Sequence, residues 1–225
     1  MLQRGWRTPP AKEPTKSEAE FEQERVAKVD WLVTEGLLHS EHIRQALLKV
    51  PREDFIPRRY RDYAYLEVPL PLPGEQSTIS CPHSYPLFYE PLGLGRGHRF
   101  LEIGLGSGYG SAVAREVVGP EGLVVSIDVD PVTFAFAEAN LRRGGYTDVV
   151  LVNDDGSLGY FELAPYDRIA ITAAVTGVPP RLLEQLKVGG RLIAPVTAPD
   201  GTQILTLLDK TPKGIQRQRL CEVLY

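Results

Sequence analysis

A glycine-rich run from Leu101 to Gly110 is the part of the sequence whose residue types and spacing point most directly to chemistry. Gly104, Gly106 and Gly108 follow an apolar stretch that is typical of a buried strand, and a helical pattern follows them. Glycine accepts a positive φ, and its missing Cβ lets a ligand approach the main chain. The G-x-G-x-G spacing differs from the dinucleotide fingerprint G-x-G-x-x-G, whose third glycine would replace Tyr109. The run therefore predicts a ligand-binding turn that favours a ligand other than a pyrophosphate.

Three acidic residues lie at or near the carboxyl ends of successive predicted strands. Glu102 stands just before the glycine turn, Asp128 ends the run 123–127, and Asp155 follows the run 149–152. Open α/β sheets bind ligands along this edge. A strand-to-helix turn needs small residues even when no ligand binds, so the prediction of a ligand site depends on the carboxylates. They suit ribose hydroxyls and a cationic ligand. We therefore expect the cofactor S-adenosylmethionine, which has a sulfonium, an amino group and no phosphate.

The histidines and cysteines predict neither a hydrolase nor a metal centre. His83 lies three residues after Ser80, but no G-x-S-x-G elbow surrounds that serine, and a histidine behind a proline is more often a hydrogen-bonded structural residue. Other candidate ligands include His39, His42, Cys81 and Cys221. The two histidines lack accompanying ligands, and the cysteines lack C-x-x-C spacing, so we expect no metal.

Strand and helix patterns alternate from Arg99 onward, after an N-terminal region of different character. The alternation predicts a mainly parallel sheet with helices on both faces. The expected strands are 99–103, 123–127, 149–152, 167–172, 191–196, 204–208 and 220–224, and the expected helices are 107–118, 131–143 and 180–186.

The N-terminal region predicts a mobile leader, two helices and a covering segment. Residues 1–16 are rich in proline and basic residues without periodicity. A capping box at Ser17 opens a helix that Gly36 ends, and Ser40 is expected to cap a second helix that stops before Pro51. The proline-rich stretch 51–91 contains few regular elements, and long ordered loops are often functional, so we expect it to cover the substrate.

Length, charge and cysteine content restrict the class of protein further. With 225 residues the chain predicts one domain over 17–225, divided into 17–91 and a cofactor-binding core over 92–225. A net charge of -4 favours no nucleic-acid partner, and no apolar run approaches the roughly 20 residues that span a bilayer. Two cysteines without the spacing of a disulfide framework favour the reducing cytoplasm. We also expect a monomer.

Several segments, met in order, resemble motifs of the protein-L-isoaspartate O-methyltransferase family. The resemblance extends from about Leu38 to the C-terminus, and the Thr-Ile-Ser-x-Pro-His block within it is fairly specific to this family. The matching segments are VPREDFIP (50–57), QSTISCPH (76–83), the glycine run (101–109), DGSLGY with APYDRI (155–160 and 164–169), and LKVGGRLIAPV (186–196).

The resemblance implies a fold, a reaction and a set of site residues. The fold is a seven-stranded Rossmann-like methyltransferase sheet with helices on both faces and an N-terminal helical extension. The reaction is S-adenosylmethionine-dependent methylation of the α-carboxylate of L-isoaspartyl residues in damaged proteins and peptides, which would be the partners. Ser80 matches the catalytic serine. The implied cofactor residues are Glu102, Gly104, Gly106, Ser107, Asp128, Asp155 and Gly156, with Asp128 toward the ribose and Asp155 toward the adenine, and the implied substrate residues are Thr78, Ile79 and His83.

The sequence departs from the family pattern at three positions and leaves two other functions open. Ser84 and Leu105 replace the usual residue types, and Pro86 is expected to interrupt the helix after His83. The first alternative is a methyltransferase of the same fold that acts on tRNA or a biosynthetic peptide. The second is a non-catalytic module that binds S-adenosylmethionine, which retention of Ser80 in its motif disfavours.

Overall fold

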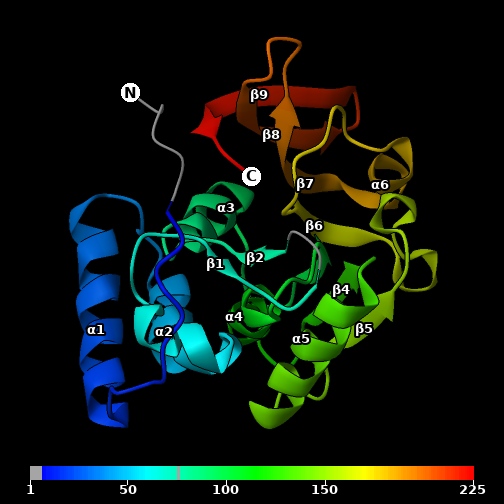
Figure 1. Cartoon of the computed structure of the whole chain (residues 1–225). Coiled ribbons are helices and arrows are strands. Elements are labelled where there is room, and N and C mark those ends of the chain that lie inside the picture. Colours follow the sequence, from blue (N-terminus) through cyan, green and yellow to red (C-terminus); the bar gives the residue numbers. More distant parts are fainter. Residues whose placement is uncertain (1–6, 75–76) are drawn as a thin grey trace.

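A seven-stranded sheet forms the centre of the molecule in the computed structural model, which describes residues 7–74 and 77–225 (Figure 1). Gln76 of the predicted motif and residues 1–6 of the predicted leader lie outside the described residues. The strands are β3 (Arg99–Ile103), β4 (Leu123–Asp128), β5 (Val150–Asn153), β6 (Tyr166–Ile171), β7 (Leu186–Thr197), β8 (Gln203–Thr211) and β9 (Gly214–Val223). Their order is β5-β4-β3-β6-β7-β8-β9, with β5 through β7 parallel and β8 and β9 antiparallel. The predicted Rossmann-like sheet is confirmed.

Apolar residues cover both faces of the central strands, as a parallel sheet requires. Phe100 and Leu101 of β3 are fully buried and belong to the two different hydrophobic clusters, one on each face of the sheet. One cluster includes residues of α4 (Tyr109–Val118) and α5 (Pro131–Arg143), and the other includes Leu182 of α6 (Pro180–Gln185). The strand order reverses between β3 and β6, so a crevice opens at the carboxyl ends of these strands.

The last three strands are longer than the sequence pattern predicts. β7 begins at Leu186 and β9 at Gly214, whereas the expected strands were 191–196 and 220–224. Most residues from Gln216 to Arg219 are exposed and polar, so hydrophobic periodicity does not mark them as a strand. They are held by backbone pairing with β8, in which Leu208 faces Arg217.

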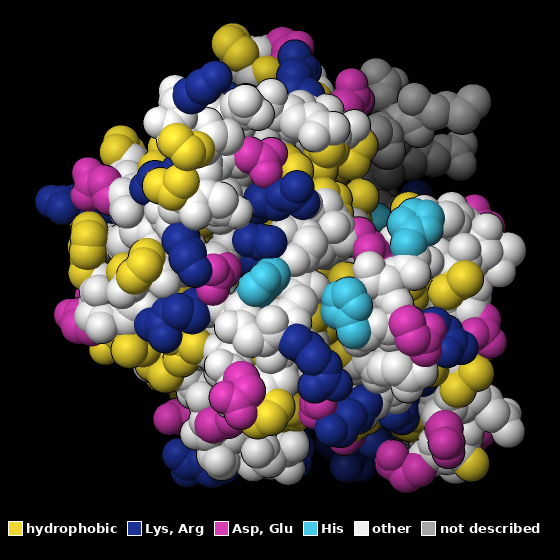
Figure 2. Space-filling model, turned by 180° about the vertical axis from the view of Figure 1, so that it is seen from behind, with side chains coloured by type: hydrophobic (Ala, Val, Ile, Leu, Met, Phe, Trp, Pro, Cys, Tyr) yellow, Lys and Arg dark blue, Asp and Glu magenta, His cyan; other side chains and the backbone are white. Residues whose placement is uncertain are grey.

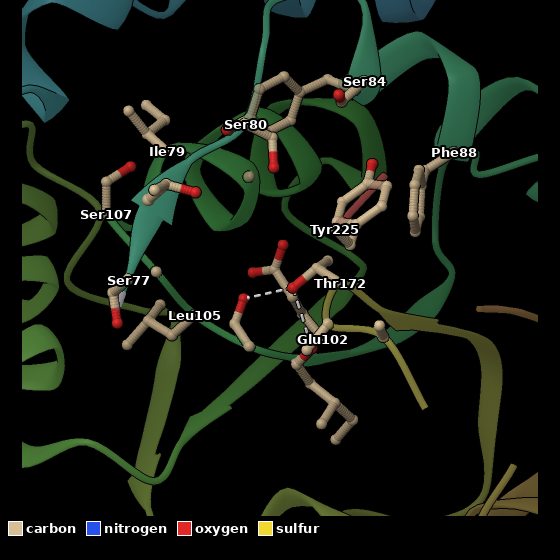
Figure 3. Close-up of a pocket in the computed structure, with 18 of the residues that line it drawn as sticks. Ser77, Ile79, Ser80, Ser84, Phe88, Glu102, Leu105, Ser107, Thr172 and Tyr225 are labelled. Carbon is tan, nitrogen blue, oxygen red and sulfur yellow. Dashed lines mark hydrogen bonds between the residues drawn. The ribbon is translucent and has the colours of Figure 1, made fainter. Parts of the chain in front are cut away.

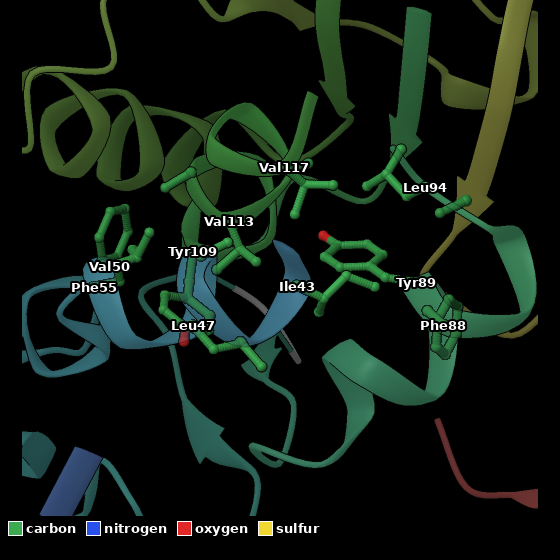
Figure 4. Close-up of a cluster of buried hydrophobic side chains, with 14 of the residues drawn as sticks. Ile43, Leu47, Val50, Phe55, Phe88, Tyr89, Leu94, Tyr109, Val113 and Val117 are labelled. Atoms are coloured by element: carbon green, nitrogen blue, oxygen red, sulfur yellow. The ribbon is translucent and has the colours of Figure 1, made fainter. Parts of the chain in front are cut away.

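Of the two N-terminal helices, the second packs on α4 of the sheet domain and the first packs on the second. In α1 (Glu18–Thr34) the predicted capping box is confirmed, because Ser17 and Glu20 each bond the other's backbone N–H. Ser40 does precede α2 (Glu41–Lys49), but its side chain does not cap the helix; its hydroxyl donates to Glu90 at 2.7 Å. Figure 4 shows apolar side chains of α2, α3 and α4 meeting in one cluster. None of the helices in the described ranges has the length and apolar character needed to span a membrane.

The segment between α2 and β3 is more regular than the sequence predicts, and the expectation for Pro86 is wrong. It contains two 3-10 helices, η1 (Arg52–Phe55) and η2 (Arg58–Tyr63), a two-stranded ribbon of β1 (Leu70–Pro71) and β2 (Thr78–Ile79), and helix α3 (Ser84–Leu92). Pro86 is the third residue of α3. Nitrogens in the first helical turn have no acceptor within the helix, so proline fits there without breaking a hydrogen bond.

Residues 12–16 of the N-terminal segment are bound to the domain, which differs from the mobile leader expected over residues 1–16. Asp62 is 4% exposed. Its carboxylate accepts hydrogen bonds from the backbone of Thr15 and Lys16 and forms an ion pair with Lys12 at 2.7 Å. Although burial opposes it, these donors lower the pKa of Asp62 well below its usual range.

The Asp62 contacts predict a pH-dependent attachment of this segment. Replacing Asp62 with alanine should destabilise the protein by about 1–3 kcal/mol at pH 7 and speed trypsin cleavage after Lys12 and Lys16. Because the folded pKa is lowered, the contribution is present above the unfolded pKa near 3.8 and is lost as the pH falls below it. Urea unfolding and timed proteolysis check this; cleavage at the wild-type rate would contradict it.

Candidate active site

A cavity of about 750 Å³ lies at the carboxyl ends of β3, β4 and β6, beneath the segment 77–85. Figure 3 shows Ser80 across this cavity from Glu102 and Thr172. Its charged lining, among the residues that the structure describes, consists of Glu102, Asp128, Asp155 and Glu222, with His83 and without lysine or arginine. Such a lining suits a ligand with positive charge and disfavours one with phosphates. The expected covering segment thus lines the same cavity as the glycine turn.

The glycine turn has the backbone that its sequence predicts. Gly104, Gly106 and Gly108 have φ values of 99°, 56° and 83°, which side chains with a Cβ rarely adopt. A Cβ on Gly104 would lie 2.3 Å from Thr172 Oγ1. Thr172 Oγ1 donates to the carbonyls of Ile103 and Gly104 at 3.0 and 2.8 Å, so β6 holds the turn in place (Figure 3).

Asp128 joins the end of β4 to the glycine turn. Its Oδ2 accepts the N–H of Gly106 at 2.9 Å, and its Oδ1 accepts the N–H of Asp130 at 3.1 Å. The carboxylate therefore has a fixed orientation at the rim of the cavity. A carboxylate can accept about four hydrogen bonds, so capacity for a ligand's hydroxyl groups remains.

The wall that contains the glycine turn is completed by Asp155, Gly156 and Ser107. Asp155 begins the 3-10 helix η3 (Gly156–Leu158), and the hydrogen bond from Ser157 N–H lowers its pKa. A Cβ on Gly156 would lie 2.4 Å from Ile103 Cγ2, so only glycine fits this position without a shift. The carbonyl of Ser107 accepts from Asn140 of α5 at 3.0 Å. The structure thus brings all seven predicted cofactor residues to one cavity.

Glu102 is a buried carboxylate, 3% exposed, at the floor of the cavity. Its Oε2 accepts hydrogen bonds from Ser111 at 2.6 Å and Ser126 at 3.1 Å. Burial outweighs these bonds and raises the pKa of Glu102 to about 7. Neither serine was predicted from the sequence. Ser126 carried a signal, a polar residue inside the apolar run of β4, but nothing local tied it to Glu102.

Replacing Glu102 with glutamine should separate stability from cofactor binding. The folded pKa of Glu102 lies above the unfolded value of 4.5, so its contribution to stability is full below 4.5 and is lost as the pH rises to about 7. At pH 8 the ligand-free variant should therefore be more stable than the wild type, by up to roughly 3 kcal/mol, and at pH 4.5 it should not. A cationic ligand favours the ionised carboxylate, so wild-type affinity for S-adenosylmethionine should fall below pH 7.

Urea unfolding and calorimetry at pH 6, 7 and 8 test these two effects of Glu102→Gln separately. The variant should bind S-adenosylmethionine about tenfold more weakly at pH 8, with affinity that no longer depends on pH in this range. A variant with wild-type affinity at pH 8 would contradict a contact between Glu102 and the cofactor. Equal stability of both proteins at pH 8 would contradict the raised pKa.

Ser80 and its neighbours form the opposite wall of the cavity. Thr78 is exposed, Ile79 is 2% exposed and also packs in the hydrophobic core, and Ser80 is half-buried. The carbonyl of Ser80 accepts from Arg52 Nη2 at 2.6 Å, while Arg52 Nε donates to the carbonyl of Ala64 at 2.7 Å. The buried guanidinium therefore fixes the backbone on which Ser80 stands. Arg52 was predicted only as part of a motif, and its contact with Ser80 was not expected.

His83 lies at the edge of the same wall and is bound to Glu67. The distance between His83 Nδ1 and Glu67 Oε2 is 2.5 Å, and Lys28 of α1 donates to the other carboxylate oxygen at 3.0 Å. The predicted substrate residues Thr78, Ile79 and His83 all line the cavity with Ser80. Lining residues that the sequence analysis did not select include Tyr85, Tyr89, Thr172 and Tyr225, which come from distant parts of the chain.

Together these features define a class of protein. Three features are those of a Rossmann-like methyltransferase: a parallel sheet with its crevice at β3 and β6, a glycine turn without the dinucleotide spacing, and carboxylates after successive strands. The acidic cavity agrees with a sulfonium cofactor. Comparison with known proteins narrows the class further.

Residues 23–225 match the model of one family, described as protein-L-isoaspartate(D-aspartate) O-methyltransferase. The chain is 43% identical to the protein-L-isoaspartate O-methyltransferase of Ignicoccus hospitalis, over 86% of this chain and 92% of the relative. It is 46% identical to protein-L-isoaspartate O-methyltransferase 1 of Archaeoglobus fulgidus, over 76% of this chain and 78% of the relative. The chain belongs to the protein-L-isoaspartate O-methyltransferase family, whose members use S-adenosylmethionine.

Solved structures agree with this assignment. A protein-L-isoaspartate O-methyltransferase superposes with a TM-score of 0.83 at 36% identity; the match covers 89% of this chain but only 64% of that chain. A Plasmodium falciparum structure with the same name, in complex with S-adenosyl-L-homocysteine, superposes with a TM-score of 0.79 over 89% of this chain and 96% of that chain. At 22% identity the second likeness concerns the fold alone.

Proposed function

We propose that this chain transfers a methyl group from S-adenosylmethionine to the α-carboxylate of L-isoaspartyl residues in damaged proteins and peptides. The observation that carries the proposal is the cavity itself. One wall holds the glycine turn with Glu102 and Asp128, and the facing wall holds Ser80 from the motif most specific to the family. A cationic donor and a peptide acceptor would therefore meet inside one cavity.

On the donor side, each predicted cofactor residue has a proposed role. Asp128 accepts hydrogen bonds from the ribose hydroxyls, and Asp155 with Gly156 lies against the adenine. Glu102 faces the positively charged methionine end. Gly104, Gly106 and Ser107 present backbone at close range, which the positive φ values of the two glycines support. With the cofactor bound, its sulfonium supplies the methyl group.

On the acceptor side, Ser80 donates a hydrogen bond to one oxygen of the substrate carboxylate and leaves the other free to attack. Thr78 and Ile79 bind the peptide on either side, and His83 contacts it from the cavity edge. A carboxylate with a pKa near 4 is already ionised at neutral pH, so the reaction needs no general base. Alignment and exclusion of water then supply the acceleration.

Methyl transfer is followed by two steps that need no enzyme, the closure of a succinimide and its hydrolysis. A carboxylate oxygen attacks the methyl carbon, the carbon–sulfur bond breaks, and S-adenosylhomocysteine leaves with the electron pair. The next backbone nitrogen can then displace methanol from the ester and close a succinimide. Water reopens this ring, in part to normal aspartate, and that outcome constitutes repair.

We further propose a cytoplasmic monomer without a nucleic-acid partner. Cys81 and Cys221 are both free thiols, which suits a reducing compartment. Among the described residues, the lining of the cavity contains no lysine or arginine that would attract a nucleic-acid backbone. On the face seen in Figure 2, Lys and Arg side chains are interspersed with Asp and Glu rather than gathered into one basic surface.

A transfer assay with three matched acceptors tests the proposed substrate. Protein with tritiated S-adenosylmethionine is given a peptide containing L-isoaspartate, the same peptide containing aspartate, or bulk tRNA. We expect labelled, base-labile methyl ester on the isoaspartyl peptide alone. Label on tRNA, or on both peptides equally, would favour the same-fold alternatives. Cofactor binding with no transfer to any acceptor would favour the non-catalytic module.

A further inference from the structure

A second group of reactive side chains lies beside Ser80. It belongs to the wall of the cavity that residues 77–85 form, which we call the acceptor wall. Glu67 precedes β1, and Cys81 and His83 follow β2, so three residue types that ligate metals converge from two segments. One ligand atom of each lies within 4.8 Å of the other two. Cys81 is 6% exposed, and Glu67 and His83 are half-buried. A thiolate, an imidazole and a carboxylate are the three ligand types that zinc takes in proteins.

The spacing of the three atoms is close to what one zinc ion requires. With bonds of about 2.0–2.3 Å, tetrahedral ligands lie roughly 3.3–3.8 Å apart. Small side-chain rotations would bring the thiol to that spacing. His83 Nδ1 and Glu67 Oε2, now 2.5 Å apart, would separate as the ion replaces the proton between them. Because Cys81 and His83 line the cavity, the fourth coordination position would face the cavity.

The charges around the cluster are compatible with a bound cation. Although burial opposes it, hydrogen bonds from His83 and Lys28 lower the pKa of Glu67, so its charge is present at neutral pH. Burial and the charge of Glu67 raise the pKa of Cys81 to about 11, so the ion would have to displace the thiol proton. The opposing cations are Arg52, which acts on Cys81, and Lys28, which lies 3.0 Å from Glu67 and 4.4 Å from the centre of the Trp31 ring.

We propose that Glu67, Cys81 and His83 form a zinc site in the acceptor wall, and that an ion bound there blocks methyl transfer. The inhibitory part rests on the function proposed above, because the open position faces the place where the substrate carboxylate is aligned by Ser80. The binding part is independent of it. No ion is needed for the methyl-transfer chemistry itself.

Cobalt is the probe for the binding part, because a thiolate-bound Co²⁺ ion has a charge-transfer band in the near ultraviolet and four-coordinate Co²⁺ has strong visible bands. Tag-free full-length protein is stripped with a chelator and titrated with Co²⁺ near pH 7.5. We expect both sets of bands at one equivalent, and their loss when Zn²⁺ is added. Cys81→Ser should abolish the charge-transfer band, and Cys221→Ser, which removes the other thiol, should keep it. His83→Gln should weaken binding at least tenfold, and Lys28→Gln should strengthen it.

The results separate this proposal from the proposed function. Absence of the charge-transfer band in the wild type, its persistence in Cys81→Ser, or its loss in Cys221→Ser would overturn the site. Circular dichroism of Cys81→Ser checks its fold; if that variant does not fold, His83→Gln decides, and unchanged cobalt affinity in it overturns the site. With an active wild type, Zn²⁺ should inhibit transfer and a chelator should restore it. Bound zinc without inhibition would overturn the blocking role.

Discussion

Replacing Ser80 with alanine should lower kcat by about 100-fold and leave the affinity for S-adenosylmethionine within about twofold of wild type. The serine stands on the acceptor wall, across the cavity from the glycine turn and Glu102 (Figure 3). We therefore expect its hydroxyl to align the attacking carboxylate and not to bind the donor. Steady-state kinetics with an isoaspartyl peptide and calorimetry with the donor measure the two effects.

Asp128→Ala is the reciprocal control, because Asp128 fixes the donor side through Gly106. It should weaken donor binding about 100-fold, while kcat at saturating donor falls much less. Thr78→Ala, an exposed neighbour on the acceptor wall, should change kcat by less than about tenfold. Normal turnover by Ser80→Ala, or a loss of donor affinity as large as that of Asp128→Ala, would remove Ser80 from its proposed role.

Replacing Arg52 with glutamine should destabilise the protein by about 3–5 kcal/mol and also lower kcat. Arg52 is 1% exposed, and its guanidinium holds the carbonyls of Ala64 and Ser80. It also lies 5.5 and 5.2 Å from the ring centres of Tyr85 and Tyr109. A shorter neutral side chain would leave both carbonyls without their donor and remove the contact of the guanidinium with the two rings.

The matched control for Arg52→Gln is Arg58→Gln, because Arg58 is 78% exposed and its ion pair with Glu13 lies in solvent. That change should cost less than about 1 kcal/mol. Arg52→Lys keeps the charge and one donor, so it should recover part of the stability but less of kcat, since it cannot reach both carbonyls as a fork. Urea unfolding measures the stability. If Arg52→Gln unfolds like Arg58→Gln, the anchoring of the Ser80 segment by Arg52 is wrong.

The fold was predictable from the sequence where burial sets the pattern. The central strands are buried on both faces, so they read as apolar runs, and the glycines at 104, 106 and 108 marked the turn because other residues rarely adopt its positive φ values. β9 was predicted too short because it lies at the sheet edge with polar exposed residues, where backbone pairing with β8 determines the strand. Pro86 was misjudged because its effect depends on where the helix begins.

The candidate site was predictable only in part. Carboxylates at strand ends could be placed, because parallel strands bring their carboxyl ends to one edge. The partners of those groups could not. Ser111 and Ser126 come together at Glu102 only through the packing of α4 on β4, and Arg52 reaches Ser80 across 28 positions. The Glu67, Cys81 and His83 cluster likewise joins a loop to the end of β2, without any recognisable spacing in the sequence.

The central claim is that the cavity places a cationic donor beside a carboxylate that is already ionised, so that alignment replaces a general base. The most direct test is the single-turnover rate of methyl transfer to an isoaspartyl peptide at saturating donor, between about pH 5.5 and 8.5. The substrate carboxylate titrates near pH 4, so this rate should vary by less than about twofold across the range. A rate that falls about tenfold for each pH unit below 7 would show that a base must be deprotonated, and would contradict the account.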